Sequence, residues 1–291
     1  MLFATMPKYV QMVMGPAGAG KSTYCAAMEE YFQATKKNVK IINLDPAAED
    51  FKYTCALDVR DIISSDDVME ELSYGPNGAL VYAMEYLVQN LDEFFVEELE
   101  NFGDDAYFIF DCPGQIELYS YLPVMREFVE SMQMRDFRIV GVYCMEASFC
   151  CEPNKFISAS LTALSTMVNL ELPHVNVMTK CDLLQGEEIK EDDALESFLD
   201  LDIQNVTDQL ENMPGFSAQY KKLNSAMAEL LSEYSLVSFA TLNLSMEESI
   251  ENVVIQVHSA INYGEEVEPN DPDAGKDDNG EEDPWAFDDE E

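Results

Sequence analysis

A glycine-rich stretch near the start of the chain has the residue types that bind a polyphosphate. It consists of Gly15, Pro16, Ala17, Gly18, Ala19, Gly20, Lys21, Ser22 and Thr23, which fits the pattern GxxxxGK[ST]. Glycines let backbone N–H groups surround phosphate oxygens, and a helix that begins behind the loop directs its positive end at the same charge. We therefore expect Lys21 to reach the β- and γ-phosphates and Ser22 to bind Mg²⁺.

Two acidic side chains follow apolar runs further along the chain. Asp111 ends one such run and is followed by Cys112-Pro113-Gly114-Gln115. A carboxylate in this position is typical of a Mg²⁺ site, and the Gln115 amide, which both donates and accepts, is suited to orienting a water molecule. Asp45 ends another run, before Pro46. On its own Asp-Pro indicates a turn, but beside the other motifs it predicts a residue that holds a Mg²⁺-bound water or positions the nucleophile.

A third motif, Thr179-Lys180-Cys181-Asp182, has the residues that recognise a guanine base. The Asp182 carboxylate can accept hydrogen bonds from guanine N1–H and from its exocyclic amino group together, whereas adenine offers no such pair. The stem of Lys180 can lie over the base. Thr179 stands where an Asn is more usual and removes one amide. A further base-binding loop should lie near Ala240–Asn243, although no sharp motif marks it.

A fourth short motif, Gly75-Pro76-Asn77-Gly78, lies between an acidic segment and a long amphipathic one. Judged by local chemistry alone it is a turn, because proline fixes φ while asparagine and glycine tolerate left-handed geometry.

The strands and helices on either side of these motifs determine where the motifs lie in the fold. Short apolar runs rich in β-branched and aromatic residues predict strands that are buried on both faces, namely Tyr9–Met14, Val39–Leu44, Ala106–Phe110, Arg138–Met145, Val175–Met178 and Leu236–Leu242. Helix-length patterns alternate with them: Lys21–Thr35, Val59–Leu72, Gly78–Phe102, Ile116–Met134, Asn154–Leu170, Glu187–Glu211, Ser217–Tyr234 and Ser245–Asn262. The alternation predicts an α/β fold of the P-loop NTPase kind, with a doubly wound, mainly parallel sheet that gathers the motifs at its carboxyl edge.

Composition divides the chain of 291 residues into two parts. Residues 1–264 are expected to form the folded nucleotide-binding domain. Residues 265–291 carry 14 acidic residues and one lysine, which predicts a disordered acidic tail; its only tryptophan, Trp285, is either solvated or part of a short partner-binding motif. The net charge of −41 argues against direct binding to nucleic acid or anionic membranes and favours a basic protein partner.

The cysteines indicate a reducing compartment. Seven are scattered without Cys-x-x-Cys spacing, and only two histidines accompany them, so a zinc site is not expected. No secretory leader or apolar run of membrane-spanning length is found, and we expect a cytoplasmic or nuclear protein.

Taken together, the motifs resemble those of the GPN-loop GTPases, and the phosphate loop is most similar to that of the third of the family's three eukaryotic branches. The segments that carry the resemblance are Gly15–Cys25, Asn43–Glu49, Gly75–Gly78, Asp111–Tyr119 and Thr179–Asp182. Thr179 in place of Asn is accepted in that family. Residues Met1–Thr5 precede the usual start of the family, seen here at Met6–Tyr9, and have no expected role.

The resemblance implies properties that residue spacing does not show. Family members dimerise face to face, so that Gly75, Pro76 and Asn77 reach the partner's site and Asn77 donates to its phosphoryl group, in place of a plain turn. Asp45, Asp111 and Gln115 fall on the residues that bind Mg²⁺ and position water. The third branch further implies GTP and GDP as ligands, a paralogous subunit or a second copy as partner, and a role in the assembly and nuclear delivery of RNA polymerase II, with passage from cytoplasm to nucleus.

Slow turnover is the expected kinetic behaviour. The four arginines, Arg60, Arg126, Arg135 and Arg138, lie in no phosphate motif, so transition-state charge is left to Lys21, Mg²⁺, backbone N–H groups and an asparagine from the partner. Two other functions fit less well. A P-loop kinase for a small-molecule or nucleotide acceptor normally needs an arginine-rich lid, and a non-catalytic acidic chaperone would not need the intact motifs.

Overall fold

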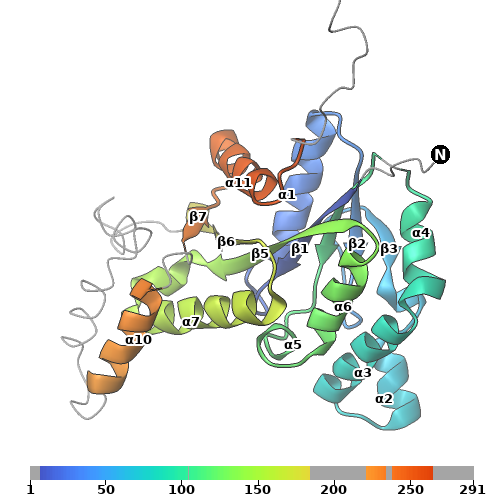
Figure 1. The fold of residues 1–291 in the computed structure, drawn as a ribbon, viewed down its shortest axis with the longest axis horizontal. Helices are drawn as coiled ribbons and strands as arrows, with labels where there is room; N and C mark the ends of the chain where they lie inside the picture. The colour runs from blue at the N-terminus through green and yellow to red at the C-terminus, as the bar shows by residue number, and fades with distance from the viewer. Residues whose placement is uncertain (1–6, 104, 184–220, 234–237, 265–291) are drawn as a thin grey trace, which may run out of the picture.

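The computed structural model describes residues 7–103, 105–183, 221–233 and 238–264. Within these ranges seven strands form one sheet in the order β3-β2-β4-β1-β5-β6-β7, and every neighbouring pair is parallel (Figure 1). The strands are β1 Lys8–Met14, β2 Val39–Asn43, β3 Cys55–Asp58, β4 Tyr107–Asp111, β5 Phe137–Glu146, β6 His174–Thr179 and β7 Phe239–Thr241. The predicted doubly wound α/β fold is confirmed.

Strand β3 is the one strand that the sequence did not predict. It has four residues, lies at the edge of the sheet, and each of its residues is only partly buried. An edge strand of this length needs no continuous apolar run, which is the pattern by which the other strands were recognised.

Helices cover both faces of the sheet (Figure 1). On one face α1 (Lys21–Ala34) and α11 (Glu247–Ala260) share a core with Tyr107 and Ile109 of β4. On the other face Phe108 and Phe110 pack in a core with α3 (Pro76–Gln89) and α6 (Val124–Gln133). The long helix α7 (Pro153–Leu170) and α10 (Lys221–Glu233) pack beside β5 and β6. Because β4 is buried on both faces, successive side chains of this strand point alternately into the core on one face of the sheet and into the core on the other.

Three predicted helices are shorter or interrupted. The segment Val59–Leu72 divides into a 3-10 turn, Val59–Asp61, and α2, Ser65–Leu72, because the Ser64 hydroxyl caps α2 by accepting from the Asp67 N–H at 3.1 Å. The segment Gly78–Phe102 becomes α3, a π-helical turn at Asp92–Val96 and α4 at Glu97–Glu100. The segment Ile116–Met134 becomes α5, Glu117–Ser120, and α6, with Pro123 as the N-cap of α6.

Two remaining short 3-10 turns follow strands, at Ala147–Cys151 and Cys181–Leu183. The predicted helix Glu187–Glu211, the residues Met1–Thr5 and the acidic tail lie outside the described residues. None of the helices that the structure describes is long and apolar enough to span a bilayer.

The register of the central strands fixes where the motifs lie. Asp111 at the end of β4 pairs with Val13 of β1 on one side and with Asn43 of β2 on the other. The ladder extends past the strand ends, since the Leu44 N–H donates to the Asp111 carbonyl at 2.8 Å and the Cys112 N–H donates to the Val13 carbonyl at 3.1 Å. The residues that follow β1, β2 and β4 therefore leave the sheet at one edge, as the sequence predicts.

Candidate functional site

The phosphate loop has the backbone that its glycines allow. Gly15, Gly18 and Gly20 have φ values of +135°, +78° and +87°. A Cβ on Gly15 would lie 2.4 Å from the Cys144 carbonyl oxygen, so no other residue fits there. Gly20 is the N-cap of α1, and Lys21 Nζ bonds back to the Pro16 carbonyl oxygen at 3.3 Å. The loop and its lysine thus have the arrangement expected of a polyphosphate cradle.

The Asp111 motif lies against this loop. A Cβ on Gly114 would be 3.1 Å from Ala17 Cα, so glycine permits the two loops to touch. The Asp111 side chain is buried and accepts hydrogen bonds from the Tyr53 hydroxyl, at 3.0 Å, and from Ser22. Burial raises the pKa of the Asp111 carboxyl, while these two hydrogen bonds and the charge of Lys21 act in the opposite direction. Ser22, Lys21 and Asp111 are therefore together, as predicted.

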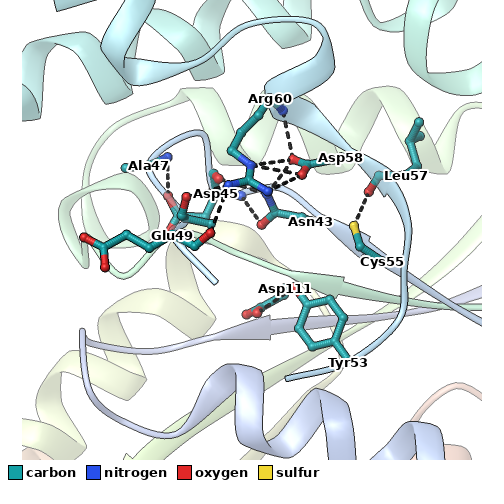
Figure 2. Close-up of polar contacts among 11 residues, drawn as sticks. Asn43, Asp45, Ala47, Glu49, Tyr53, Cys55, Leu57, Asp58, Arg60 and Asp111 are labelled. Carbon is teal, nitrogen blue, oxygen red and sulfur yellow. Dashed lines mark hydrogen bonds and ion pairs between the residues drawn. The ribbon is translucent and has the colours of Figure 1, made fainter. Parts of the chain in front are cut away.

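Asp45 joins them from the end of β2. Its Oδ1 accepts from the Ala47 N–H at 3.0 Å, and its own N–H donates to Asn43 Oδ1 at 3.0 Å (Figure 2). Burial raises the pKa of the Asp45 carboxyl, and the Ala47 hydrogen bond and the positive charge of Lys21 lower it. The negative charge of Asp45 also raises the pKa of Asp111, so the two carboxyl groups interact electrostatically.

These oxygens fit a magnesium ion that a nucleotide helps to hold. The available donors are the Ser22 hydroxyl and the carboxylates of Asp111 and Asp45, all hard oxygen ligands. Among the described residues no group of three or more His, Cys, Asp or Glu side chains could cage a metal by itself. Mg²⁺ commonly binds through one or two carboxylates together with phosphate oxygens and water, so the donor set suits that ion.

A pocket of about 230 Å³ lies beside the phosphate loop. Its lining includes Gly20, Thr23, Tyr24, Lys52, Thr179, Lys180, Asp182, Leu183, Leu242 and Leu244. The predicted base-reading residues Thr179, Lys180 and Asp182 thus face one cavity with the start of α1. Lys180 has φ +61° and pairs with Glu146 at 2.8 Å, which lowers the pKa of the Glu146 carboxyl.

Thr179 has a contact that its sequence did not suggest. Its buried hydroxyl lies 2.6 Å from the Ala19 carbonyl oxygen and 3.1 Å from the Met145 carbonyl oxygen. One hydroxyl proton can serve only one of these acceptors, and the shorter contact joins the base-reading segment to the phosphate loop. The threonine therefore provides a link between the two loops, although it has no side-chain amide.

Other pocket residues were missed or placed only roughly by the sequence. Leu242 lies within the stretch Ala240–Asn243 where a last base loop was expected, and both Leu242 and Leu244 line the pocket. Lys52 belongs to no motif, yet it lines the pocket and its Nζ lies 3.1 Å from Thr23 Oγ1. Only the folding of the β2–β3 connection beside α1 brings it there.

The GPN residues begin a helix. Gly75 is the N-cap of α3, Pro76 is its first residue and Asn77 its second, so the interpretation as a plain turn is wrong. All four residues of Gly75–Gly78 are exposed. Asn77 Oδ1 accepts a hydrogen bond from Gln115 Nε2 at 3.0 Å. From the sequence, a turn asparagine in a single chain is not expected to reach that chain's own phosphate site. This contact nevertheless places Asn77 beside Gln115 of the same chain.

Comparisons with known proteins show the family to which the chain belongs. A family model described as a conserved hypothetical ATP binding protein matches residues 13–263. GPN-loop GTPase 3 of Dictyostelium discoideum is 46% identical over 92% of both chains, and GPN-loop GTPase 3 of Danio rerio is 45% identical over 92% of both. The corresponding Saccharomyces cerevisiae protein is 42% identical over 89% of this chain and 96% of its own length.

A solved structure supports the fold. The apo form of a GTPase from Pyrococcus abyssi aligns with a TM-score of 0.68 over 88% of this chain and 98% of that chain, at 22% identity. Because relatives above 40% identity cover about nine-tenths of the chain, the chain belongs to the GPN-loop GTPases and hydrolyses GTP.

Proposed function

We propose that the protein is a magnesium-dependent GTPase switch that works as a dimer, with the GPN loop of each subunit completing the site of the other. The observation that carries the proposal is the exposure of all four residues of Gly75–Gly78 at the start of α3. Leu72 and Tyr74, next to the loop, are 43% and 49% exposed. Apolar side chains beside a site residue favour burial against another subunit.

In this site each side chain has a distinct part in the chemistry. Lys21 and the loop N–H groups bind the phosphates, and Mg²⁺, when bound, neutralises charge on the β- and γ-phosphate oxygens. Ser22, Asp111 and Asp45 hold the ion or its water ligands. Because the Gln115 amide nitrogen donates to Asn77, its carbonyl oxygen is left to accept from the attacking water.

The positions of the arginine side chains support the expectation that GTP hydrolysis is slow. Arg60 pairs with Asp58, Arg126 with Glu130 and Glu171, and Arg135 with Asp92. Arg138 lies over the Tyr9 ring, at the opposite end of β1 from the phosphate loop. With no arginine at the phosphates, a neutral amide supplies the remaining stabilisation of transition-state charge, which suits a switch better than a metabolic enzyme.

The client and the location follow from the family resemblance. We propose a paralogous GPN-loop subunit, or a second copy, as the dimer partner, and RNA polymerase II subunits as the client whose assembly and nuclear delivery depend on GTP turnover. A net charge of −41 supports a basic surface on such a partner and opposes direct contact with nucleic acid or anionic membrane. Residence in the cytoplasm with passage to the nucleus is part of this proposal.

A native preparation tests the proposal. The protein is isolated at low salt, its nucleotide is identified by chromatography, its mass is measured by light scattering, and co-purifying chains are identified by mass spectrometry. We expect GDP or GTP, a dimer, and polymerase subunits. A monomer that hydrolyses GTP at full rate would contradict shared sites, and phosphoryl transfer to an acceptor other than water would favour the kinase alternative.

A further inference from the structure

The segment Asn43–Arg60, which runs from the last residue of β2 past the end of β3, contacts both acidic residues of the proposed magnesium site, Asp111 and Asp45. One of the contacts is direct. The Tyr53 hydroxyl donates to Asp111 Oδ2 at 3.0 Å, and Tyr53 is only 8% exposed (Figure 2). A hydrogen bond to one carboxylate oxygen restricts rotation of the whole carboxyl group. Tyr53 belongs to none of the nucleotide motifs.

At the other end of the segment, Asn43 holds the backbone of Asp45. The fully buried Asn43 side chain accepts from the Asp45 N–H at 3.0 Å and donates to the Asp45 carbonyl oxygen at 3.0 Å. Its amide nitrogen also donates to Asp58 Oδ1 at 2.8 Å. The position of Asp45 therefore depends on an amide whose orientation is fixed by Asp58.

Arg60 connects these two ends. Its guanidinium binds both Asp58 oxygens, with Nη2 2.6 Å from Oδ2 and Nε 3.1 Å from Oδ1, and Nη1 donates to the carbonyl oxygens of Ala48 and Glu49 at 2.8 and 3.2 Å. These two carbonyls belong to the loop that follows Asp45. All three nitrogens of the guanidinium thus make hydrogen bonds within this part of the chain, so Arg60 is not a candidate for a phosphate contact.

The same guanidinium is also linked to Tyr53, through the Phe51 ring. It lies 4.6 Å from the centroid of the Phe51 ring, and Phe51 stacks on Tyr53 with 5.2 Å between centroids. A series of contacts therefore runs from Asp45 through Asn43, Asp58 and Arg60 to Phe51, Tyr53 and Asp111. Figure 2 shows its two polar ends, at Asp45 and at Asp111.

We propose that Tyr53 and Arg60 are positioning residues that hold Asp111 and Asp45 in the arrangement that Mg²⁺ requires. The inference rests on the magnesium dependence in the proposed function. A lysine cannot replace Arg60, because an ammonium has no planar fork to bind Asp58 and two carbonyls while stacking on Phe51. The loss of hydrogen bonds that orient metal-site residues commonly weakens metal binding by about tenfold or more.

Metal affinity is the direct test, with Mn²⁺ as the probe. GDP-loaded protein is titrated with Mn²⁺, and free Mn²⁺ is measured by electron paramagnetic resonance. Tyr53→Phe keeps the ring and its stacking but removes the hydroxyl, so we expect Mn²⁺ binding to weaken by about tenfold. GDP affinity in EDTA should stay within about twofold of wild type, because the change removes no nucleotide contact.

Tyr107→Phe is the matched control. It removes a different buried hydroxyl, on β4, which accepts a hydrogen bond from Gln11 Nε2 at 2.9 Å and not from a group at the carboxylates. Mn²⁺ affinity should be unchanged in this variant. Equal Mn²⁺ affinity in Tyr53→Phe and wild type would overturn the role of Tyr53, and so would equal weakening in both tyrosine variants.

A second pair of variants tests Arg60. Arg60→Lys should weaken Mn²⁺ binding, whereas Arg126→Lys, which alters an exposed pair with Glu130 on α6, should not. Thermal melts identify any variant that fails to fold. If Arg60→Lys binds Mn²⁺ as wild type does, Arg60 has no positioning role. Wild-type protein that binds GDP but not Mn²⁺ would instead overturn the magnesium dependence itself, and this inference with it.

Discussion

Gln115 and Asn77, which are 38 residues apart in the chain, are joined by a hydrogen bond of 3.0 Å from Gln115 Nε2 to Asn77 Oδ1. Gln115 follows the buried Asp111, and Asn77 begins α3 at the surface. The contact places the GPN loop beside Gln115, the residue predicted to position water, within a single chain. Both residues can then be tested separately for binding and for catalysis.

Gln115→Leu should separate these two properties. Leucine keeps most of the volume but can neither orient water nor contact Asn77. We expect GTP affinity to change little, while single-turnover hydrolysis falls tenfold or more, about 1.4 kcal/mol of barrier. Stopped-flow binding and single-turnover assays measure the two quantities, and an equal loss in both would make Gln115 structural.

Asn77→Ala should slow hydrolysis by as much as ~10²-fold, because it removes a donor from charge that develops during transfer. If Asn77 only capped or packed the start of α3, the same change would cost a few tenths of a kcal/mol of stability and no activity. Single-turnover rates and urea denaturation of the variant decide between these outcomes.

Mixing two variants shows which subunit receives Asn77. An Asn77→Ala chain is combined with a Lys21→Ala chain, so that the one competent nucleotide site lies in the chain that lacks Asn77. Shared sites predict recovery of hydrolysis on mixing; action on Gln115 of the same chain predicts none. Light scattering must confirm dimers, and with an obligate paralogous partner the rate is measured at the partner's site.

Asp182→Asn should weaken GTP binding by at least about 1.5–3 kcal/mol, because a charged acceptor is lost and an amide donor opposes guanine N–H groups. Xanthosine triphosphate is a sharp control, since xanthine has a carbonyl oxygen where guanine has its amino group. Calorimetry should show the variant gaining affinity for it. Unchanged GTP affinity would refute the assignment of Asp182 to the base.

Removal of residues 265–291 should leave folding and hydrolysis nearly unchanged. The segment has too few apolar residues to form a core, and its 14 acidic side chains repel one another. The melting temperature and the GTPase rate of protein truncated after Gly264 provide the check. A fall in melting temperature of several degrees would instead mean that the segment binds the folded domain.

Stability should fall between pH 7 and pH 5 in part through His174. Among the residues that the structure describes, neither ring nitrogen of His174 has a hydrogen-bond partner, and burial lowers the pKa of His174 from 6.5 to about 4. Below pH 6.5 the unfolded chain therefore binds a proton at His174 that the native state does not. The contribution of His174 to the free energy of unfolding is thus fully present above pH 6.5 and is lost as the pH falls toward 4. By pH 5 the loss is about 2 kcal/mol.

His174→Phe keeps a ring to stack on Tyr143 but cannot titrate. Urea denaturation at pH 7 and pH 5 should show a stability difference smaller than that of wild type by about 2 kcal/mol. Equal differences in the two proteins would mean that His174 is protonated in the native state.

The sequence by itself determined the fold class and most of the nucleotide site. Apolar runs identified six of the seven strands that the structure describes, since a strand buried on both faces must be apolar throughout. Parallel strands place their carboxyl ends at one edge, so motifs that follow four strands, with Lys21, Asp45, Asp111 and Asp182, were already expected on the same edge of the sheet.

Only the tertiary structure showed the contacts that hold these residues in place. The bonds of Tyr53 to Asp111, of Thr179 to Ala19 and of Asn77 to Gln115 join segments 58, 160 and 38 residues apart. Likewise, only the folded structure showed that Lys52 and Leu244 line the same pocket as Asp182. Periodicity and motif spacing report local order and strand ends, whereas such contacts depend on how loops pack after the sheet has formed, and their distances follow from no local pattern of residues.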